Sequence, residues 1–120
     1  MHKLKKSMIV YKKIYNAPSQ QRHQGGDLIA TLLLPKGTLV RLKPTADNAA
    51  VKNRANRAIV LDIVLVGYPH NQVSKGYAGY DNTRYTAGAR IKPAEKFSQS
   101  REECASGIHF FLSRQRAFEY

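Results

Sequence analysis

The sequence predicts a single α+β domain that is mainly β and spans residues 1–120, and three observations lead to this prediction. Several short segments alternate apolar and polar residues, or are rich in β-branched and aromatic side chains, as half-buried strands are. Eight glycines and five prolines separate these segments at short intervals. Helical character is confined to short stretches. We therefore expect one compact domain of about five to seven short strands with one or two short helices, the last at the C-terminus.

The first elements are strands separated by polar segments. Met8–Tyr15 alternates and is rich in β-branched and aromatic residues, which predicts a strand. Asp27–Leu34 is an apolar run that stops at a proline, and Leu39–Leu42 follows a turn, so we expect a hairpin or a sharp corner between two strands. Gly37 would supply the positive φ that this turn requires. Residues 1–7 are rich in lysine, and we expect them to form a flexible basic segment.

The middle of the chain contains one strong strand signal among weaker ones. Residues 44–56 are polar and predict a loop or a short frayed helix. Ala58–Val66 is almost continuously apolar, which favours a strand buried on both faces. Residues 67–97 are rich in glycine and predict loops with two short edge strands, Arg84–Thr86 and Ala89–Ile91.

The C-terminal residues predict a strand followed by a helical turn. Ile108–Leu112 is apolar apart from one histidine, which is typical of a short buried strand. Ser113 is suited to cap a helix over Arg114–Tyr120, because its hydroxyl can accept a hydrogen bond from a free backbone N–H of the first turn.

The composition is strongly basic, with 20 Lys and Arg residues, 8 Asp and Glu residues and a net charge of +12 at pH 7. Residues 1–57 contain 12 of these cations and two acidic residues, which is a net charge of +10. A solubilising surface needs less charge than this, so we expect an anionic partner: a nucleic acid, a nucleotide signal or an acidic protein surface. We favour a nucleic acid or a nucleotide, although charge alone does not separate the three. The cations assigned to this role are Lys36, Arg41, Lys43, Lys52, Arg54 and Arg57.

A tyrosine-rich segment provides a second candidate surface. Aromatic rings between cations are suited to stacking on nucleobases while the cations contact phosphates. The alternative is that the tyrosines cover the edge of a sheet and the glycines serve turns. The candidate residues are Tyr77, Tyr80 and Tyr85 for stacking, with Lys75, Arg84 and Arg90 for anion binding.

Several classes of protein are disfavoured by what the sequence lacks. A single cysteine excludes an internal disulfide, and the histidines have no metal-ligand spacing, so we expect no metal and no cofactor. No paired carboxylates, catalytic triad or phosphate-binding loop is evident, and we favour a non-enzymatic protein. The longest apolar stretch, residues 58–66, is too short to span a membrane, and no secretory signal is recognisable. We therefore expect a cytoplasmic protein without a membrane partner.

Residues 103–120 carry the most distinctive motif, Glu-Cys-Ala-Ser-Gly-Ile-His-Phe-Phe followed by a capped helix. With Cys104, Gly107 and His109 as its marked positions, the motif resembles an uncharacterised domain family of phages and giant viruses that also occurs beside pentapeptide repeats. The resemblance extends back to about Val10. It implies a phage or viral setting inside a host cell, where the protein would interfere with host or bacterial defence, or serve as a structural or adaptor protein of a virion.

Gly107–Phe111 is also similar to the Gly-Ile-Tyr-Phe element of ADP-ribosyltransferases. This resemblance implies an NAD-dependent enzyme in which His109 replaces the aromatic residue that stacks on nicotinamide, and Lys12 replaces the cofactor-binding residue of the first strand. The catalytic Glu of that family follows on a later element, whereas Glu119 lies on the adjoining helical turn. The alternative role of His109 is that of a hydrogen-bonded core histidine, pointing to the opposite face from its two neighbours.

Overall fold

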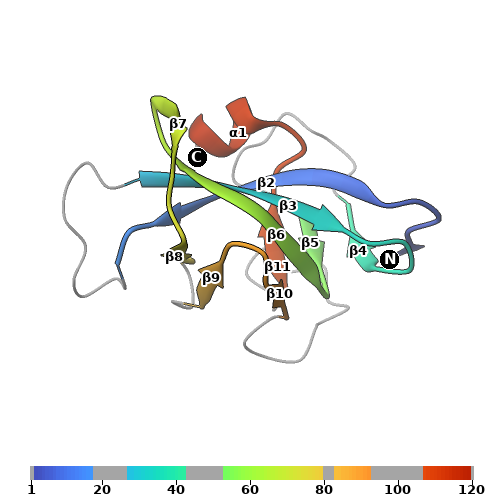
Figure 1. The fold of residues 1–120 in the computed structure, drawn as a ribbon. Helices are drawn as coiled ribbons and strands as arrows, with labels where there is room; N and C mark the ends of the chain where they lie inside the picture. Colours follow the sequence, from blue (N-terminus) through green and yellow to red (C-terminus); the bar gives the residue numbers. More distant parts are fainter. Residues whose placement is uncertain (1, 18–26, 43–52, 80–82, 93–106, 120) are drawn as a thin grey trace.

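The computed structural model describes residues 2–17, 27–42, 53–79, 83–92 and 107–119, which form two antiparallel sheets and one short helix (Figure 1). This confirms the mainly β, α+β class and the compact single domain. The smaller sheet has the order β1–β4–β5–β11. The larger sheet has the order β10–β6–β3–β2–β8–β9, with β7 also paired to β6. The elements are β1 (His2–Lys3), β2 (Met8–Tyr15), β3 (Asp27–Leu34), β4 (Leu39–Arg41), β5 (Asn53–Ala55), β6 (Ala58–Leu65), β7 (Tyr68–Gln72), β8 (Lys75–Tyr77), β9 (Arg84–Thr86), β10 (Arg90–Ile91), β11 (Ile108–Phe110) and α1 (Arg114–Glu119).

The described residues contain eleven strands, more than the five to seven expected. Seven of the eleven are only two or three residues long. Four of these short strands (β4, β9, β10 and β11) lie where the sequence predicts strands, whereas β1, β5 and β8 do not, because their conformation is set by pairing with distant strands. The longer β7 was expected to be a loop.

The centre of the larger sheet consists of the adjacent antiparallel strands β2, β3 and β6, each eight residues long. A β-bulge interrupts the β3–β6 pair, because Thr31 lies opposite Asp62 while Leu32 lies opposite Val60. Leu61 is the extra residue and is 45% exposed. The prediction that this strand is buried on both faces is therefore wrong at Leu61, since a bulge turns a side chain out of the alternation.

The smaller sheet begins at the N-terminal residues, which were expected to be flexible. His2 and Lys3 pair with β4, and the Leu4 N–H donates to the carbonyl of Thr38 at 2.9 Å. The Leu4 carbonyl accepts from Gly37 N–H at 2.9 Å, and its side chain is only 9% exposed. The expectation fails because one apolar residue among the lysines anchors the segment to the core.

The transition from β3 to β4 is a corner, because the two strands belong to different sheets. Gly37 has a φ of 89°, as predicted for this turn. Asn53–Ala55 forms β5 between β4 and β11, so this part of residues 44–56 is neither loop nor helix. Pairing on both sides decides its conformation, which its polar sequence did not indicate.

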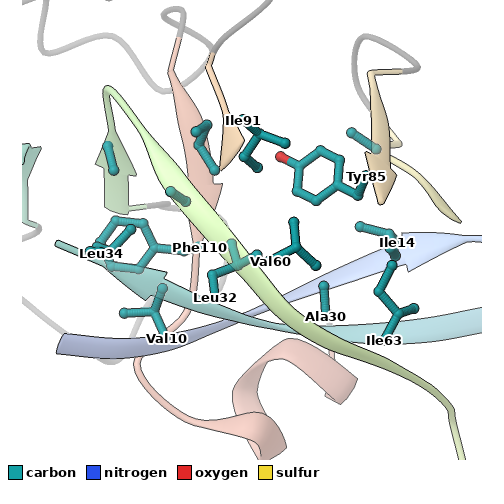
Figure 2. Packing of buried hydrophobic residues seen from close by; sticks show 14 of the residues in the cluster. Val10, Ile14, Ala30, Leu32, Leu34, Val60, Ile63, Tyr85, Ile91 and Phe110 are labelled. Carbon is teal, nitrogen blue, oxygen red and sulfur yellow. The ribbon is translucent and has the colours of Figure 1, made fainter. Parts of the chain in front are cut away.

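The main core lies between the two sheets (Figure 2). Val10, Leu32 and Val60 contribute from adjacent strands of the larger sheet, and each is fully buried. Phe110, also fully buried, enters the same cluster from β11 of the smaller sheet. Burial of such side chains from water is the dominant favourable term in holding the sheets together.

A second, smaller cluster lies on the other face of the larger sheet, under α1. It contains Ile29, Val64, Phe111 and Ala117. The helix begins where predicted, since the Ser113 hydroxyl accepts a hydrogen bond from Arg116 N–H at 3.1 Å. Within the described residues, no helix is long and apolar enough to cross a membrane.

The segment after β6 is more ordered than the loop expected there. Gly67, with a φ of 83°, connects β6 to β7. β8 and β9 then form a two-stranded ribbon attached to the end of β2, and β10 pairs with the outer edge of β6. β9 and β10 are the short strands predicted at residues 84–86 and 89–91.

Candidate functional site

An aromatic and basic surface lies on the outer face of the β8–β9 ribbon. Tyr77 is opposite Tyr15 of β2 on one side and opposite Arg84 of β9 on the other. Directly opposite residues of antiparallel strands share a face, with Cβ atoms about 4.5–5.5 Å apart. Lys75 lies on this face too, two residues before Tyr77. We call Tyr15, Lys75, Tyr77 and Arg84 the ribbon surface.

The orientation of the ribbon is set by the small size of Gly76. A Cβ atom on Gly76 would lie 2.5 Å from Cδ1 of Ile14 and 3.0 Å from Cδ1 of Leu28, which are both core side chains. Gly76 and the opposing Tyr85 therefore face the core, and their neighbours face outward. Lys75 and Arg84 are exposed, while Tyr77 and Tyr15 are half-buried.

Tyr15 is a residue of this surface that sequence reasoning did not identify. Its ring is backed by Gly79, where an added Cβ would lie 2.8 Å from Cε2 of Tyr15. The sequence did contain one signal for Tyr15, because it ends the alternating segment Met8–Tyr15 and the alternation places it on the same face as Tyr11. The pairing of β2 with β8, which brings it beside Tyr77, has no local signature.

Tyr85, predicted to stack on nucleobases, belongs to the core instead. Its side chain is 2% exposed, and the Lys12 ammonium lies 6.0 Å from the centre of its ring. The reason is the alternation of β9, in which Tyr85 faces inward between the exposed Arg84 and Thr86. Tyr80 lies outside the described residues, so Tyr77 is the predicted stacking residue that the structure places outward.

Arg41, Arg54 and His109 lie in a row across the smaller sheet. Arg41 is opposite Arg54 on β4 and β5, and Arg54 is opposite His109 on β5 and β11. Arg54 is 2% exposed and His109 is 6% exposed. Burial, and after it the positive charge of Arg41, lowers the pKa of the Arg54 guanidinium from its ordinary value. Like charges at directly opposite positions of neighbouring strands repel each other.

Lys12 and His109, the two residues of the enzymatic alternative, are brought together. The Lys12 ammonium donates a hydrogen bond of 2.9 Å to the main-chain carbonyl of His109. Beside this contact, Tyr11 and Phe111 exchange two backbone hydrogen bonds, of 2.9 and 2.7 Å, which join β2 to the end of β11. The contact involves the backbone of His109, and the ring itself is buried.

Arg57 holds the corner between β3 and β4. Its Nε donates to Oγ1 of Thr38 at 3.2 Å, and its Nη2 donates to the carbonyl of Lys36 at 3.0 Å. These bonds give Arg57 a structural role that its place in a basic run did not suggest. The side chain of Lys36 on the same corner is exposed.

The other predicted positions are dispersed or lie outside the described residues. Arg90 is exposed on β10, opposite Ile59 of β6, and Gly107 leads into β11. Among the described residues, no three His, Cys, Asp or Glu side chains gather where they could hold a metal ion. The predicted positions outside the described residues are Lys43, Lys52, Tyr80 and Cys104.

Comparison with known proteins identifies a family without an assigned activity. No curated protein and no solved structure matches the chain. A family model described as a family of unknown function, DUF5758, matches residues 2–117. This match includes both sheets, the ribbon surface and most of α1. The chain therefore belongs to the DUF5758 family.

Proposed function

We propose that this protein binds an anionic partner, and specifically a single-stranded nucleic acid, through the ribbon surface. The observation that carries the proposal is the row Tyr15–Tyr77–Arg84 across β2, β8 and β9, with Lys75 exposed beside it. Nucleobases of any sequence present a flat face that can stack on Tyr77. The neighbouring cations Lys75 and Arg84 would then contact phosphates of the bound strand. This is the arrangement by which proteins bind single strands without strong sequence preference.

The charge of the whole chain supports the same partner. A net charge of +12 attracts a polyanion over long range and raises the rate of encounter. Arg41, on the smaller sheet, adds to this positive charge. An acidic protein surface would respond to the same charge but would not require stacking on Tyr77, whereas the base of a nucleotide signal would stack on the same ring.

A setting for this activity follows from the resemblance to phage and giant-virus domains. We propose that the protein acts inside a host cell and interferes with a defence system by capturing a nucleic acid. The family match itself supports a domain of unknown function.

The test is fluorescence anisotropy with a labelled, unstructured oligonucleotide of about 12 nucleotides, within the range of single-strand site sizes. Tyr77→Leu keeps apolar bulk but removes the flat ring, and we expect it to weaken binding by about 1–3 kcal/mol. The matched control is Tyr68→Leu, which removes an exposed tyrosine from β7 and leaves the ribbon surface intact. Absence of binding at low salt, or equal weakening by both variants, would refute the proposal.

The enzymatic alternative, an NAD-dependent ADP-ribosyltransferase, has less support. His109 would have to present its ring to nicotinamide, yet the residue is only 6% exposed, and the Lys12 ammonium donates a hydrogen bond to its carbonyl. We therefore expect no NAD consumption by the purified protein. Turnover that disappears in His109→Ala, with the fold retained, would reverse this preference.

A further inference from the structure

A groove lies between α1 and the strands beneath it, on the opposite side of the larger sheet from the main core. Its volume is about 230 Å³. Ile29, Val64 and Val66 line the strand side, and Arg114 and Phe118 line the helix side. In Figure 1 the helix lies beside the β6–β7 hairpin, where Gly67 completes the groove.

The two sides of the groove differ in chemistry. Ile29 and Val64 are 3% and 5% exposed and give an apolar floor, whereas Phe118 is 50% exposed and stands at the rim. An exposed aromatic ring beside an apolar depression is typical of an interaction site rather than of a solvated helix face.

The rim carries a positive charge that is held in place. The Arg114 guanidinium lies 5.5 Å from the centre of the Tyr11 ring, within cation–π distance. The carboxylate of Asp27, at the start of the adjoining β3, is paired with Lys13 at 3.3 Å. The first turn of α1 contains no acidic residue. Of the residues that line the groove, Arg114 is the charged one, and its charge favours an anion.

We propose that this groove binds an acidic peptide segment of a partner protein, with one or two apolar side chains in the groove and a carboxylate on Arg114. The volume is below the range of about 300–1,000 Å³ of small-molecule sites and suits side chains rather than a cofactor. Charge complementarity selects the acidic partner, because a chain of net charge +12 attracts acidic segments and repels a second copy of itself. The site is separate from the ribbon surface and does not depend on nucleic-acid binding.

The probe is the peptide acetyl-Glu-Glu-Leu-Phe-Glu-Glu-amide, titrated into the ¹⁵N-labelled full chain and followed by NMR. We expect chemical-shift changes at Val64, Val66, Gly67 and Phe118. Replacement of Leu-Phe in the peptide by Ala-Ala should weaken binding by about tenfold or more, since burial of a large apolar side chain is lost. Replacement of the four Glu by Gln should weaken it by about threefold, the effect of an exposed ion pair.

Two matched pairs of variants locate the site. Arg114→Gln should weaken the acidic peptide by about threefold and leave the Gln peptide unchanged, whereas Arg116→Gln, with the same loss of charge on the same helix but outside the groove, should have less effect. Phe118→Ala should weaken both peptides. Leu112→Ala, at a residue 52% exposed and also outside the groove, should weaken neither.

Three results would overturn the proposal. Equal effects of Arg114→Gln and Arg116→Gln would reduce the interaction to general electrostatic attraction. Equal binding of the Glu and Gln peptides would show that the occupant is a neutral apolar segment. Concentration-dependent shifts of the groove residues without peptide would identify a second copy as the occupant. Oligonucleotide binding by Arg114→Gln, expected to equal that of the wild type, separates this proposal from the proposed function.

Discussion

The ammonium of Lys12 donates a 2.9 Å hydrogen bond to the carbonyl of His109, a residue 97 positions away in the chain. Lys12 belongs to β2 of the larger sheet and His109 to β11 of the smaller one. The aliphatic part of Lys12 runs along the core side of β2, where Val10 and Ile14 are fully buried. This contact and the Tyr11–Phe111 bridge join β2 of the larger sheet to the β11 end of the smaller one.

Lys12→Met should therefore destabilise the protein. The substitution keeps an unbranched apolar chain, but it removes the ammonium that donates to the His109 carbonyl and lies near the Tyr85 ring. We expect a loss of about 1–3 kcal/mol in the free energy of unfolding, measured by urea denaturation. Lys13→Met removes one partner of the partly exposed Lys13–Asp27 ion pair and should cost less, about 1 kcal/mol or below. Equal losses of stability in Lys12→Met and Lys13→Met would show that the Lys12–His109 hydrogen bond contributes no more than a surface ion pair.

Arg57→Gln should weaken the corner between β3 and β4. The variant loses the hydrogen bonds to Thr38 and to the Lys36 carbonyl, and we expect a loss of about 1 kcal/mol in a thermal or urea unfolding experiment. Lys36→Gln is the matched control, because it removes a charge from the same corner but leaves the backbone carbonyl in place. If the control is as destabilising as Arg57→Gln, the corner depends on charge rather than on these bonds.

Gly76→Ala should strain the attachment of the ribbon to the core. Its new methyl group would approach Cδ1 of Ile14 and Cδ1 of Leu28 to 2.5 and 3.0 Å, and the cost of such overpacking is about 1–3 kcal/mol. Thr86→Ala, at an exposed position of the neighbouring strand, should change stability by less than about 0.5 kcal/mol. An unchanged unfolding midpoint for Gly76→Ala would mean that the inward face of the ribbon is wrongly assigned.

Arg41→Gln should leave the protein equally stable or slightly more stable, unlike most substitutions. Burial, and after it the neighbouring charge of Arg41, lowers the pKa of Arg54, so the charged form of Arg54 is disfavoured in the folded state. The unfavourable free energy of the charged Arg54 is present at every pH at which the guanidinium is protonated. It is lost only as the pH rises through the lowered pKa of Arg54 in the folded protein. We expect a gain of a few tenths of a kcal/mol that does not change between about pH 5 and 9. A clear loss of stability would show that Arg41 makes a favourable contact that outweighs the repulsion.

The long strands could be predicted from the sequence because their side chains alternate or stay apolar over eight residues. The division into two sheets could not, since β4, β5 and β11 are three residues long and are defined by their partners. The bulge at Leu61 could not be predicted from the sequence either, because it depends on the register in which β6 pairs with β3.

The candidate site was predicted in composition but not in arrangement. The sequence indicated that Lys75, Tyr77 and Arg84 belong to an aromatic and basic segment, and the structure places them on one face. The sequence also suggested Tyr85 as a member of this surface, but Tyr85 faces the core. It did not indicate Tyr15, which lies opposite Tyr77. Only the register of β8 against β2 and β9 separates the outward tyrosine from the inward one.

The measurement that tests the central claim most directly is the salt dependence of oligonucleotide binding by the wild type and by the double variant Lys75→Gln/Arg84→Gln. Each phosphate contact to a single strand contributes about 0.7 to the slope of log K against log salt concentration. If both cations contact phosphates, the double variant should bind more weakly, and its slope should be shallower by about 1.4. The matched control Arg114→Gln/Arg116→Gln, which removes the same charge from α1, should keep the wild-type slope. An unchanged slope for the ribbon variant, or an equal change in the control, would contradict binding at the ribbon surface.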